Sequence, residues 1–298
     1  MIRPVAHVAS LPFDLDRPED YARWRERKLQ EHSTRIEDLI VEIRDPRHLT
    51  PTEHAAILAR CRRDNMAIYA SQAQDDPDKE IPQRLGAQLG LLRLDHNIGA
   101  DEDAISSLTV RSDAHHRGYI PYSNRPIAWH TDGYYNSPDR QIHGMLLHCV
   151  SPAASGGEND LLDHEILYIM LRDRNPEFVR ALMHPRAMTI PANHVDGKEL
   201  RPEQAGPVFS VHPDGHLHMR YTDRSRSILW HEDPLTAEAV ACLKDLLHTG
   251  TVWHFRGRLE AGWGLVCNNT LHTRTAFEDG THPRLLYRAR YYDRIQGT

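Results

Sequence analysis

The sequence predicts an α+β protein whose core is a β-sandwich or jelly roll. Helical patterns dominate the first 90 residues, and short strand patterns dominate from residue 106 onward. Early helices followed by many short strands favour this class, because each apolar sheet face needs another layer to bury it. No linker rich in glycine, serine or proline divides the 298 residues, so we expect residues 1–298 to form a single domain.

The chain is expected to begin with a helix, a strand and a second helix. Residues 17–32 show a helical pattern with a proline and acidic residues in its first turn, which is typical of a helix start. Residues 36–46 alternate apolar and polar side chains and stop at a proline, as a strand does. Residues 49–65 should form the best-delimited helix, because Thr50 and Glu53 have the spacing of a capping box.

Strands are expected to make up most of the remaining chain. A short buried strand at 66–71 and a helix at 78–90 come first, and further helical patterns lie at 161–183 and 236–250. Apolar runs rich in β-branched and aromatic residues, bounded by turn residues, predict the other strands. These strands are expected at residues 106–112, 127–135, 142–150, 217–222, 251–256, 263–269 and 283–292.

Composition and charge fit a soluble globular protein, and four cysteines without paired spacing make the reducing cytoplasm the expected compartment. Hydrophobic residues make up 40% and charged residues 26% of the chain, which is ordinary for a folded domain. The net charge of −6 gives no basic footprint for nucleic acid. We expect neither a signal peptide nor a membrane span, because no apolar run is long enough, and the four scattered cysteines predict no disulfide framework. A homo-oligomer is compatible with the sequence.

A histidine two residues before an aspartate is the first candidate metal-ligand pattern. It occurs at 130/132, 194/196, 212/214 and 231/233, and about one or two occurrences are expected by chance. Glycines that follow Asp196 and Asp214 indicate turns at two of these places, and Asp233 is a candidate N-cap. Only His130 and Asp132 lie in a predicted strand, where residues two apart project from the same face. Both side chains can therefore reach one ion.

His272, in the segment NNTLHTRTAF, is the best candidate for a third ligand. Two histidines and one carboxylate form the facial triad of non-haem Fe(II) oxygenases, whose open positions take a bidentate cosubstrate and dioxygen. Zinc accepts the same ligands, so a zinc-dependent hydrolase is an alternative, although the HExxH motif is absent. His212, His216 and His218 are a minor candidate for a second metal site, because a hairpin with histidines on its solvent face explains them equally well.

Three arginines share one face of the last predicted strand. Arg284, Arg288 and Arg290 alternate with apolar and aromatic residues, so they project from the same side. Buried guanidinium groups are costly unless they meet anions, and an arginine near the metal suits the far carboxylate of a dicarboxylate. The alternative is a strand face that lies in water.

Four segments together resemble the taurine/2-oxoglutarate dioxygenase (TauD/TfdA-like) family. They are WHTDGYYN, SGGEND, NNTLHTRTAF and PRLLYRARYY. They follow the order of the family at roughly its spacing, from near residue 105 to the end of the chain. The resemblance implies a double-stranded β-helix core, the cupin-like form of the jelly roll, with flanking helices. It also implies Fe(II) held by His130, Asp132 and His272.

The resemblance further implies the cosubstrates and two of their contacts. The enzyme would use 2-oxoglutarate and dioxygen, and Arg284 would bind the distal carboxylate of 2-oxoglutarate. Asn159 stands where the family usually has a threonine that helps to hold this cosubstrate, and its amide can still donate a hydrogen bond. The alternative is that Gly156 and Gly157, before it, only make a turn or bulge.

Four residues are candidates for binding the organic substrate. In the family an arginine at the position of Arg288 often lies near the acidic group of the substrate, and Tyr134, Tyr135 and Asn124 flank the metal ligands. Packing on the sheet is the alternative role of the tyrosines. We expect a dioxygenase that hydroxylates or oxidatively cleaves an unactivated C–H position, with release of succinate and CO2. Its substrate would be a small anionic metabolite such as an amino acid, carboxylate or sulfonate. The other alternative is a non-catalytic, cupin-like binding protein.

Overall fold

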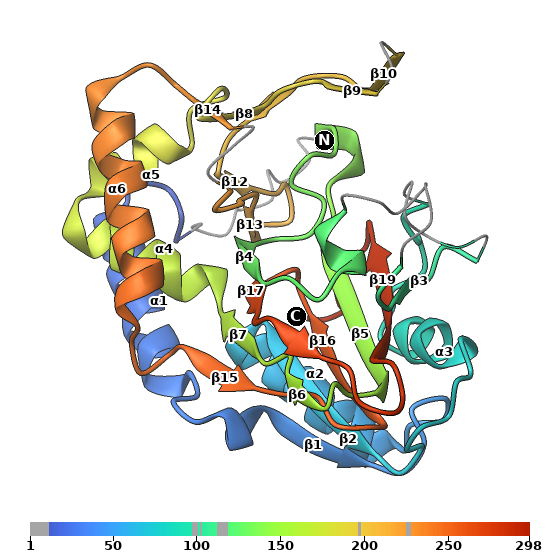
Figure 1. Ribbon diagram of the computed structural model, residues 1–298. Coiled ribbons are helices and arrows are strands. Elements are labelled where there is room, and N and C mark those ends of the chain that lie inside the picture. Colours follow the sequence, from blue (N-terminus) through green and yellow to red (C-terminus); the bar gives the residue numbers. More distant parts are fainter. Residues whose placement is uncertain (1–11, 97–100, 102, 112–118, 196–197, 225–227) are drawn as a thin grey trace, which may run out of the picture.

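Two β-sheets occupy the centre of the molecule (Figure 1). The computed structural model describes residues 12–96, 101, 103–111, 119–195, 198–224 and 228–298. The larger sheet has the strand order β1 (Ile40–Ile43), β2 (Met66–Ser71), β16 (Trp263–Cys267), β5 (Gly144–Ser151), β19 (Leu285–Tyr291) and β3 (Ser106–Leu108). The smaller sheet has the order β15 (Phe255–Gly257), β7 (Asn159–Leu162), β17 (Leu271–Arg274) and β4 (Ile127–His130). Only β1 and β2 pair in parallel in these two sheets.

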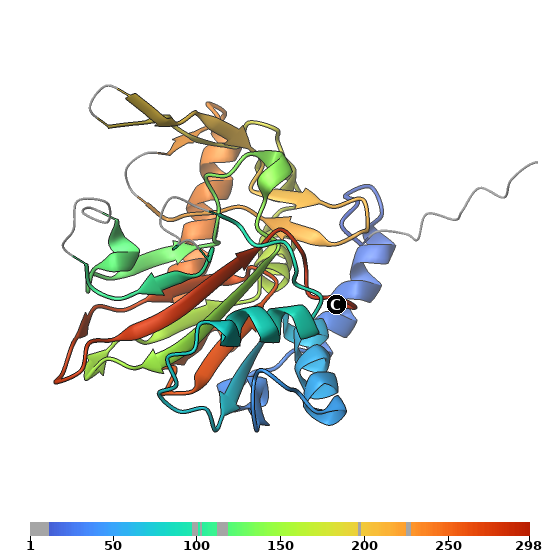
Figure 2. The ribbon, with the colours of Figure 1, turned by 90° about the vertical axis from the view of Figure 1, so that its right-hand side faces the viewer.

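One apolar cluster lies between the two sheets and a second lies behind the larger one. Leu147 of β5 and Leu161 of β7 belong to the first cluster. The neighbouring Leu146 faces the second cluster, with residues of helices α2 (Pro51–Asp64) and α3 (Glu80–Gln88). Figure 2 shows these helices along the larger sheet. Strand β5 is therefore buried on both faces, which explains its continuous apolar run.

A third cluster covers the other side of the smaller sheet. Trp129, Leu162 and Leu271 of that sheet pack there against buried helical residues. Besides α2 and α3, the described residues form the helices α1 (Pro18–Glu31), α4 (His164–Arg174), α5 (Pro176–Leu182) and α6 (Pro234–Thr249). They also form the short 3-10 helices η1 (Ile36–Leu39), η2 (Ile120–Tyr122) and η3 (Pro138–Arg140). Figure 1 shows α1, α4, α5 and α6 gathered on one side of the molecule. The α+β class is thus confirmed.

Short strands extend the structure beyond the two sheets. A three-stranded sheet has the order β11 (Gln204–Gly206), β8 (Met188–Ile190) and β14 (Leu229–Trp230). The pairs are β9 (Asn193–Val195) with β10 (Lys198–Arg201), β12 (Phe209–Val211) with β13 (Leu217–Met219), and β6 (Ser155–Gly156) with β18 (Phe277–Glu278). The sequence did not predict β8–β11, because none of these strands exceeds four residues and their alternation is weak.

The predicted helix at 161–183 is wrong as a single element. Residues 159–162 form β7, and the helical part breaks into α4 and α5 at Asn175. Asn175 has an extended backbone and its Oδ1 accepts a hydrogen bond from the Glu177 N–H at 3.0 Å. Pro176 has no N–H to continue the preceding helix and disfavours a helical conformation at Asn175. Asn175 therefore ends one helix and caps the next.

Several other predicted bounds were too long, whereas the predicted capping box is confirmed. The strand predicted at 106–112 ends at Leu108, and Ser112 lies outside the described residues. The strand predicted at 127–135 ends at His130. Thr50 accepts from the Glu53 N–H at 3.3 Å, and Glu53 accepts from the Thr50 N–H at 2.7 Å. The predictions for residues 1–11 and Asp196 also fall outside the described residues.

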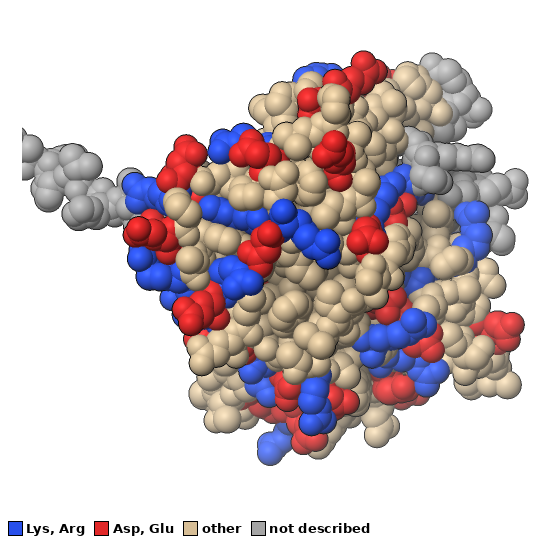
Figure 3. Space-filling view, turned by 90° about the vertical axis from the view of Figure 1, so that its left-hand side faces the viewer, with Lys and Arg blue, Asp and Glu red and all other residues tan. Residues whose placement is uncertain are grey.

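Charged side chains of both signs are mixed over the face formed by the helices (Figure 3). Arg25 and Asp173, for example, form an ion pair at 2.6 Å with both side chains more than a third exposed. Exposed pairs of this kind contribute roughly 0–1 kcal/mol to stability, because water screens them. Among the described residues, the helices include none with the length and apolar character needed to cross a membrane.

His148 should make the stability of the protein depend on pH. It is fully buried in β5, where its Nδ1 lies 3.0 Å from the Tyr69 hydroxyl, and burial lowers its pKa to about 4. Unfolding therefore takes up a proton between pH 4 and the ordinary histidine pKa of about 6.5. As the pH falls through this window, the free energy of unfolding should decrease by up to about 1.4 kcal/mol per pH unit. Above the window, His148 should not affect the free energy of unfolding. Thermal unfolding of His148→Phe should show a shallower slope; equal slopes would contradict the expectation.

Candidate active site

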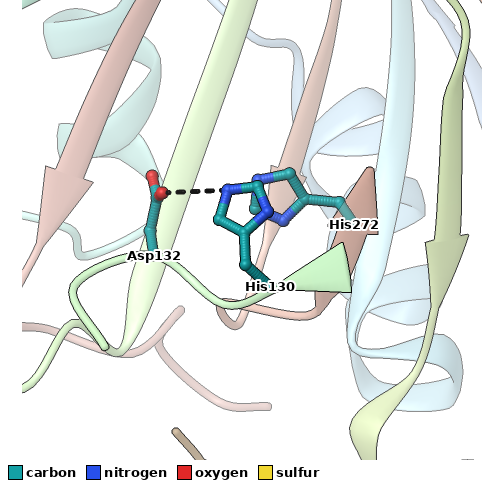
Figure 4. Close-up of side chains that lie close together, drawn as sticks. All are labelled: His130, Asp132 and His272. Atoms are coloured by element: carbon teal, nitrogen blue, oxygen red, sulfur yellow. Dashed lines mark ion pairs between the residues drawn. The ribbon is translucent and has the colours of Figure 1, made fainter. Parts of the chain in front are cut away.

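Strands β4 and β17 bring His130 and His272 together. The two residues are register partners in the antiparallel pair, and their rings lie 4.2 Å apart between centroids. Asp132 follows two residues after the end of β4. The nearest potential ligand atoms of the three side chains all lie within 4.8 Å of one another, and all three residues are buried. Figure 4 shows the two rings side by side with the carboxylate opposite them. The three predicted metal ligands therefore meet at one place.

Asp132 reaches this place from a turn, not from a strand. Beyond His130, the Thr131 N–H donates to the Tyr221 carbonyl and the Thr131 hydroxyl accepts from the Tyr221 N–H, both at 3.0 Å. Gly133 has a φ of +68°, which favours glycine, and a Cβ there would collide with Ile142. The argument that strand alternation aligns His130 with Asp132 is therefore wrong. The chain turns immediately after the strand and still points the carboxylate at the histidines.

Both histidines are oriented in the same way by their own strands. The Nδ1 of His130 lies 3.0 Å from the carbonyl of Ala128, and the Nδ1 of His272 lies 3.0 Å from the carbonyl of Thr270. A carbonyl can only accept, so each Nδ1 carries the proton and each Nε2 has its lone pair free. This is how a backbone carbonyl usually fixes the tautomer of a metal-binding histidine.

The charge states of the three side chains suit a divalent cation. Burial lowers the pKa of His130 to about 3 and also lowers that of His272, so both rings are neutral near pH 7. Burial alone would raise the pKa of Asp132, but Arg288 and Arg290 outweigh it and hold the pKa below its usual range. Two neutral imidazoles and one carboxylate therefore face one another.

An oxygen of Asp132 supports the fit to a metal ion. Its Oδ2 is buried and has no hydrogen-bond partner among the described residues, whereas Oδ1 lies 3.4 Å from Nη1 of Arg288. A buried carboxylate oxygen without a partner is costly. A cation held by this oxygen and the two Nε2 atoms would remove that cost, and the donor set matches the one that non-haem Fe(II) uses.

The three arginines in β19 and directly before it find different partners. Arg290 forms a buried ion pair with Asp95 and donates to the Tyr135 hydroxyl at 2.9 Å. Arg288 lies beside Asp132. Arg284 is buried, yet its guanidinium has no carboxylate partner among the described residues, and its Nη1 has no hydrogen bond at all. The alternative of a solvated strand face is therefore wrong, and the guanidinium of Arg284 remains available for an external anion.

Arg284 and Asn159 line the same small cavity. Its other lining residues are Pro152, Ala153, Gly157, Arg258, Leu259 and Leu286. The Arg284 guanidinium lies 4.9 Å from the ring centroid of Phe277, which fixes its orientation. Asn159 donates one amide hydrogen to the carbonyl of Thr273 at 2.6 Å. The adjacent Asp160 is not among the lining residues and bonds Thr273, so its charge does not oppose an anion at Arg284.

Arg288 lies in β19, and the other three candidate substrate residues lie in two loops. Tyr134 and Tyr135 are half-buried, with their rings 5.2 Å apart, and the exposed Arg224 donates to the Tyr134 hydroxyl at 3.1 Å. Asn124 is exposed, and its carbonyl accepts from the Phe277 N–H at 3.1 Å. Their contact with a substrate stays a prediction.

The solvent-facing alternative is wrong for one histidine of the β12–β13 hairpin, His218, whereas His212 and His216 are half-buried. His218 is buried, and the ring of His143 lies 4.3 Å from that of His212 and 4.8 Å from that of His218. Among the described residues, however, only the side chains of His130, Asp132 and His272 bring three ligand atoms together. Burial lowers the pKa of His143 to about 4 and that of His218 well below its usual range, so these two rings are neutral near pH 7.

Sequence reasoning missed the role of Arg274, two residues after His272. Its buried guanidinium donates to the carbonyls of Ser123 and Arg125, both at 2.6 Å, and of Pro121 at 3.3 Å. It thereby ties the loop that contains Asn124 to β17. An arginine within a predicted site strand could have signalled this, but its carbonyl partners are more than 140 residues away.

Comparison with known proteins identifies the family and supports the fold. The model of the family described as "Taurine catabolism dioxygenase TauD, TfdA family" matches residues 17–290. A uridine-5'-phosphate dioxygenase of Amycolatopsis sp is 27% identical over 282 residues, which cover 86% of this chain and 97% of that protein. One of Streptomyces sp is 31% identical over 207 residues, which cover 63% and 69%. The crystal structure of a taurine dioxygenase from Burkholderia xenovorans has a TM-score of 0.54 at 18% identity and shares the fold, over 85% of this chain and 88% of that one.

The family match spans both candidate metal-binding strands and the three arginines at positions 284, 288 and 290. It favours an oxygenase over the zinc-dependent hydrolase and over the non-catalytic binding protein. The chain belongs to the TauD/TfdA family and is a non-haem dioxygenase that depends on Fe(II), 2-oxoglutarate and O2.

Proposed function

We propose that His130, Asp132 and His272 hold the Fe(II) and that the enzyme oxidises a C–H position of a small anionic metabolite. The observation that carries the proposal is the convergence of three buried ligand atoms beside an unpartnered carboxylate oxygen. The ion with its cosubstrates supplies the oxidising power, and succinate and CO2 are released. The two facing sheets form the double-stranded β-helix core of a single catalytic domain.

In this proposal the work of anion binding is divided among Arg284, Arg288 and Arg290. Arg284, with Asn159 in the same cavity, binds the distal carboxylate of 2-oxoglutarate through charge-assisted hydrogen bonds. Arg288 holds Asp132 from the side and turns its remaining donors, among them the unpartnered Nε, toward the anionic group of the substrate. Arg290 is neutralised by Asp95 and serves structure.

We propose a nucleoside 5'-monophosphate such as UMP as the first substrate to test. Two relatives are named uridine-5'-phosphate dioxygenases. The residues present suit such a compound, because arginine binds phosphate well and aromatic rings such as Tyr134 and Tyr135 can stack on a base. The half-buried tyrosine pair and Arg224 lie together beyond the metal ligands.

Succinate release should separate the candidate substrates. With Fe(II), 2-oxoglutarate and oxygen, UMP should stimulate succinate formation one-for-one with oxygen consumption. Uridine, which lacks the phosphate, should have a kcat/KM at least about 10-fold lower, because hydrogen bonds to a charged group contribute about 1.5–3 kcal/mol each. Faster turnover with an amino acid or a sulfonate would contradict the nucleotide proposal, while the dioxygenase assignment would stand.

A further inference from the structure

We infer that Asn269 is the positioning residue that aims Asp132 at the metal. It lies in the turn between β16 and β17, 137 residues away from Asp132 in sequence. The inference rests on the proposed role of Asp132 as a ligand and not on the identity of the organic substrate. Nothing in the spacing of the ligands indicates this residue.

The side-chain amide of Asn269 clamps the backbone of Asp132 from both sides. Its Oδ1 accepts a hydrogen bond from the Asp132 N–H at 2.8 Å, and its Nδ2 donates to the Asp132 carbonyl at 2.9 Å. The same Nδ2 donates to the carbonyl of Ile142 at 2.7 Å. Asn269 is 2% exposed, so water cannot replace these bonds, and buried backbone groups need such partners.

The clamp is needed because no strand neighbour fixes Asp132. Strand β4 ends at His130, and Gly133 directly after the aspartate adopts a left-handed conformation. The hydrogen bonds of Asn269 to Asp132 and Ile142 also hold the two ends of the loop that contains Tyr134 and Tyr135. The direction of the carboxylate is thus set by an amide from another element.

The same turn also orients a second ligand. Thr270 directly follows Asn269, and its carbonyl lies 3.0 Å from Nδ1 of His272. Asn269 has a φ of +52°, a conformation that asparagine tolerates better than most residues. One turn therefore holds Asp132 through the side chain of Asn269 and His272 through the carbonyl of Thr270. This fixes the position of the two ligands relative to each other.

The neighbouring Asn268 offers a matched control. It is equally buried, at 3% exposure, and it also makes three hydrogen bonds through its side chain. These bonds go to Asn65, Thr298 and the Ile295 N–H, away from the metal ligands. A substitution of Asn268 should therefore lower stability without changing the direction of Asp132.

The test compares Asn269→Gly with Asn268→Ala. Glycine keeps the left-handed backbone of residue 269 and removes only the amide. Fe(II) is titrated anaerobically into each full-length protein with saturating 2-oxoglutarate, and the visible charge-transfer band reports binding, without turnover. We expect the dissociation constant of Fe(II) to rise about 10- to 100-fold for Asn269→Gly, the range found when a group that orients a ligand is lost. For Asn268→Ala it should stay within about 3-fold, well below that range.

Two outcomes would overturn the inference. One is that Asn269→Gly binds Fe(II) with the same measured affinity as Asn268→Ala. The other is that the measured affinities differ, but become equal once each is corrected for the fraction of folded protein, which thermal unfolding gives. If Asn269→Gly does not fold, Asn269→Asp keeps the acceptor for the Asp132 N–H and loses both donors, and wild-type affinity in that variant overturns the inference. Asp132→Ala separates this result from a wrong ligand assignment, because it should lose Fe(II) binding whether or not Asn269 acts as a clamp.

Discussion

Replacing His130 by alanine is expected to abolish Fe(II) binding and turnover. The substitution leaves Asp132 and His272 as the two remaining ligands, and the lost Nε2 has no substitute among the described residues, because only these three side chains bring their ligand atoms together. Loss of a group that merely orients a ligand costs about 10- to 100-fold in metal affinity. Loss of the ligand itself should therefore cost more than about 100-fold in affinity and in the rate of succinate release. Anaerobic Fe(II) with 2-oxoglutarate should give a visible band with the wild type and none with His130→Ala.

The control for this experiment is His212→Ala. His212 belongs to the packed cluster with His143 and His218, another place where histidine rings lie together. The His212→Ala variant should bind one Fe(II) with the affinity of the wild type. If His212→Ala loses the band and His130→Ala keeps it, the metal centre lies at the hairpin and the assignment is wrong.

The sequence identified the residues of the candidate site, but it did not indicate the backbone conformation and the contacts that position them. The tripeptide His130-Thr131-Asp132 was one of four similar patterns, and its place within a run of strand-forming residues distinguished it. The strand argument was correct for His130 but not for Asp132, which lies in a turn. That turn is specified by contacts with Tyr221 and Asn269, about 90 and 137 residues away in sequence. Local patterns cannot contain this information.

The fold shows the same limit. The helix at 51–64 and the strands at 66–71 and 285–291 follow from capping residues and apolar runs, which are local. The short strands between residues 188 and 211 were missed, because their pairing depends on neighbours in space. The positions of Arg284, Arg288 and Arg290 differ by even numbers of residues, so the sequence could predict that they share one face of a strand. Their different partners, an external anion, Asp132 and Asp95, could not be predicted.

Substitution of Arg284 by glutamine should raise the KM for 2-oxoglutarate by about 100-fold or more. Two charge-assisted hydrogen bonds to a carboxylate contribute about 1.5–3 kcal/mol each, and glutamine cannot replace the bidentate geometry. The substitution leaves no protein carboxylate unpaired, because Arg284 has none as a partner among the described residues. Its thermal stability without cosubstrate should therefore stay close to that of the wild type. Arg290→Gln, on the same face, breaks the buried pair with Asp95 and should destabilise the protein by about 3–5 kcal/mol.

A cosubstrate that lacks the distal carboxylate tests the contact itself. If Arg284 binds that carboxylate, the wild type should strongly prefer 2-oxoglutarate over 2-oxobutyrate, and Arg284→Gln should lose most of this preference. The interaction belongs to the pair, so removing either partner should cost about the same and removing both should cost little more. If the variant instead weakens both oxo acids equally, Arg284 acts by shaping the cavity with Phe277 and Gly157. In that case the anion is bound elsewhere, and Arg258, the other arginine that lines the cavity, becomes the residue to replace.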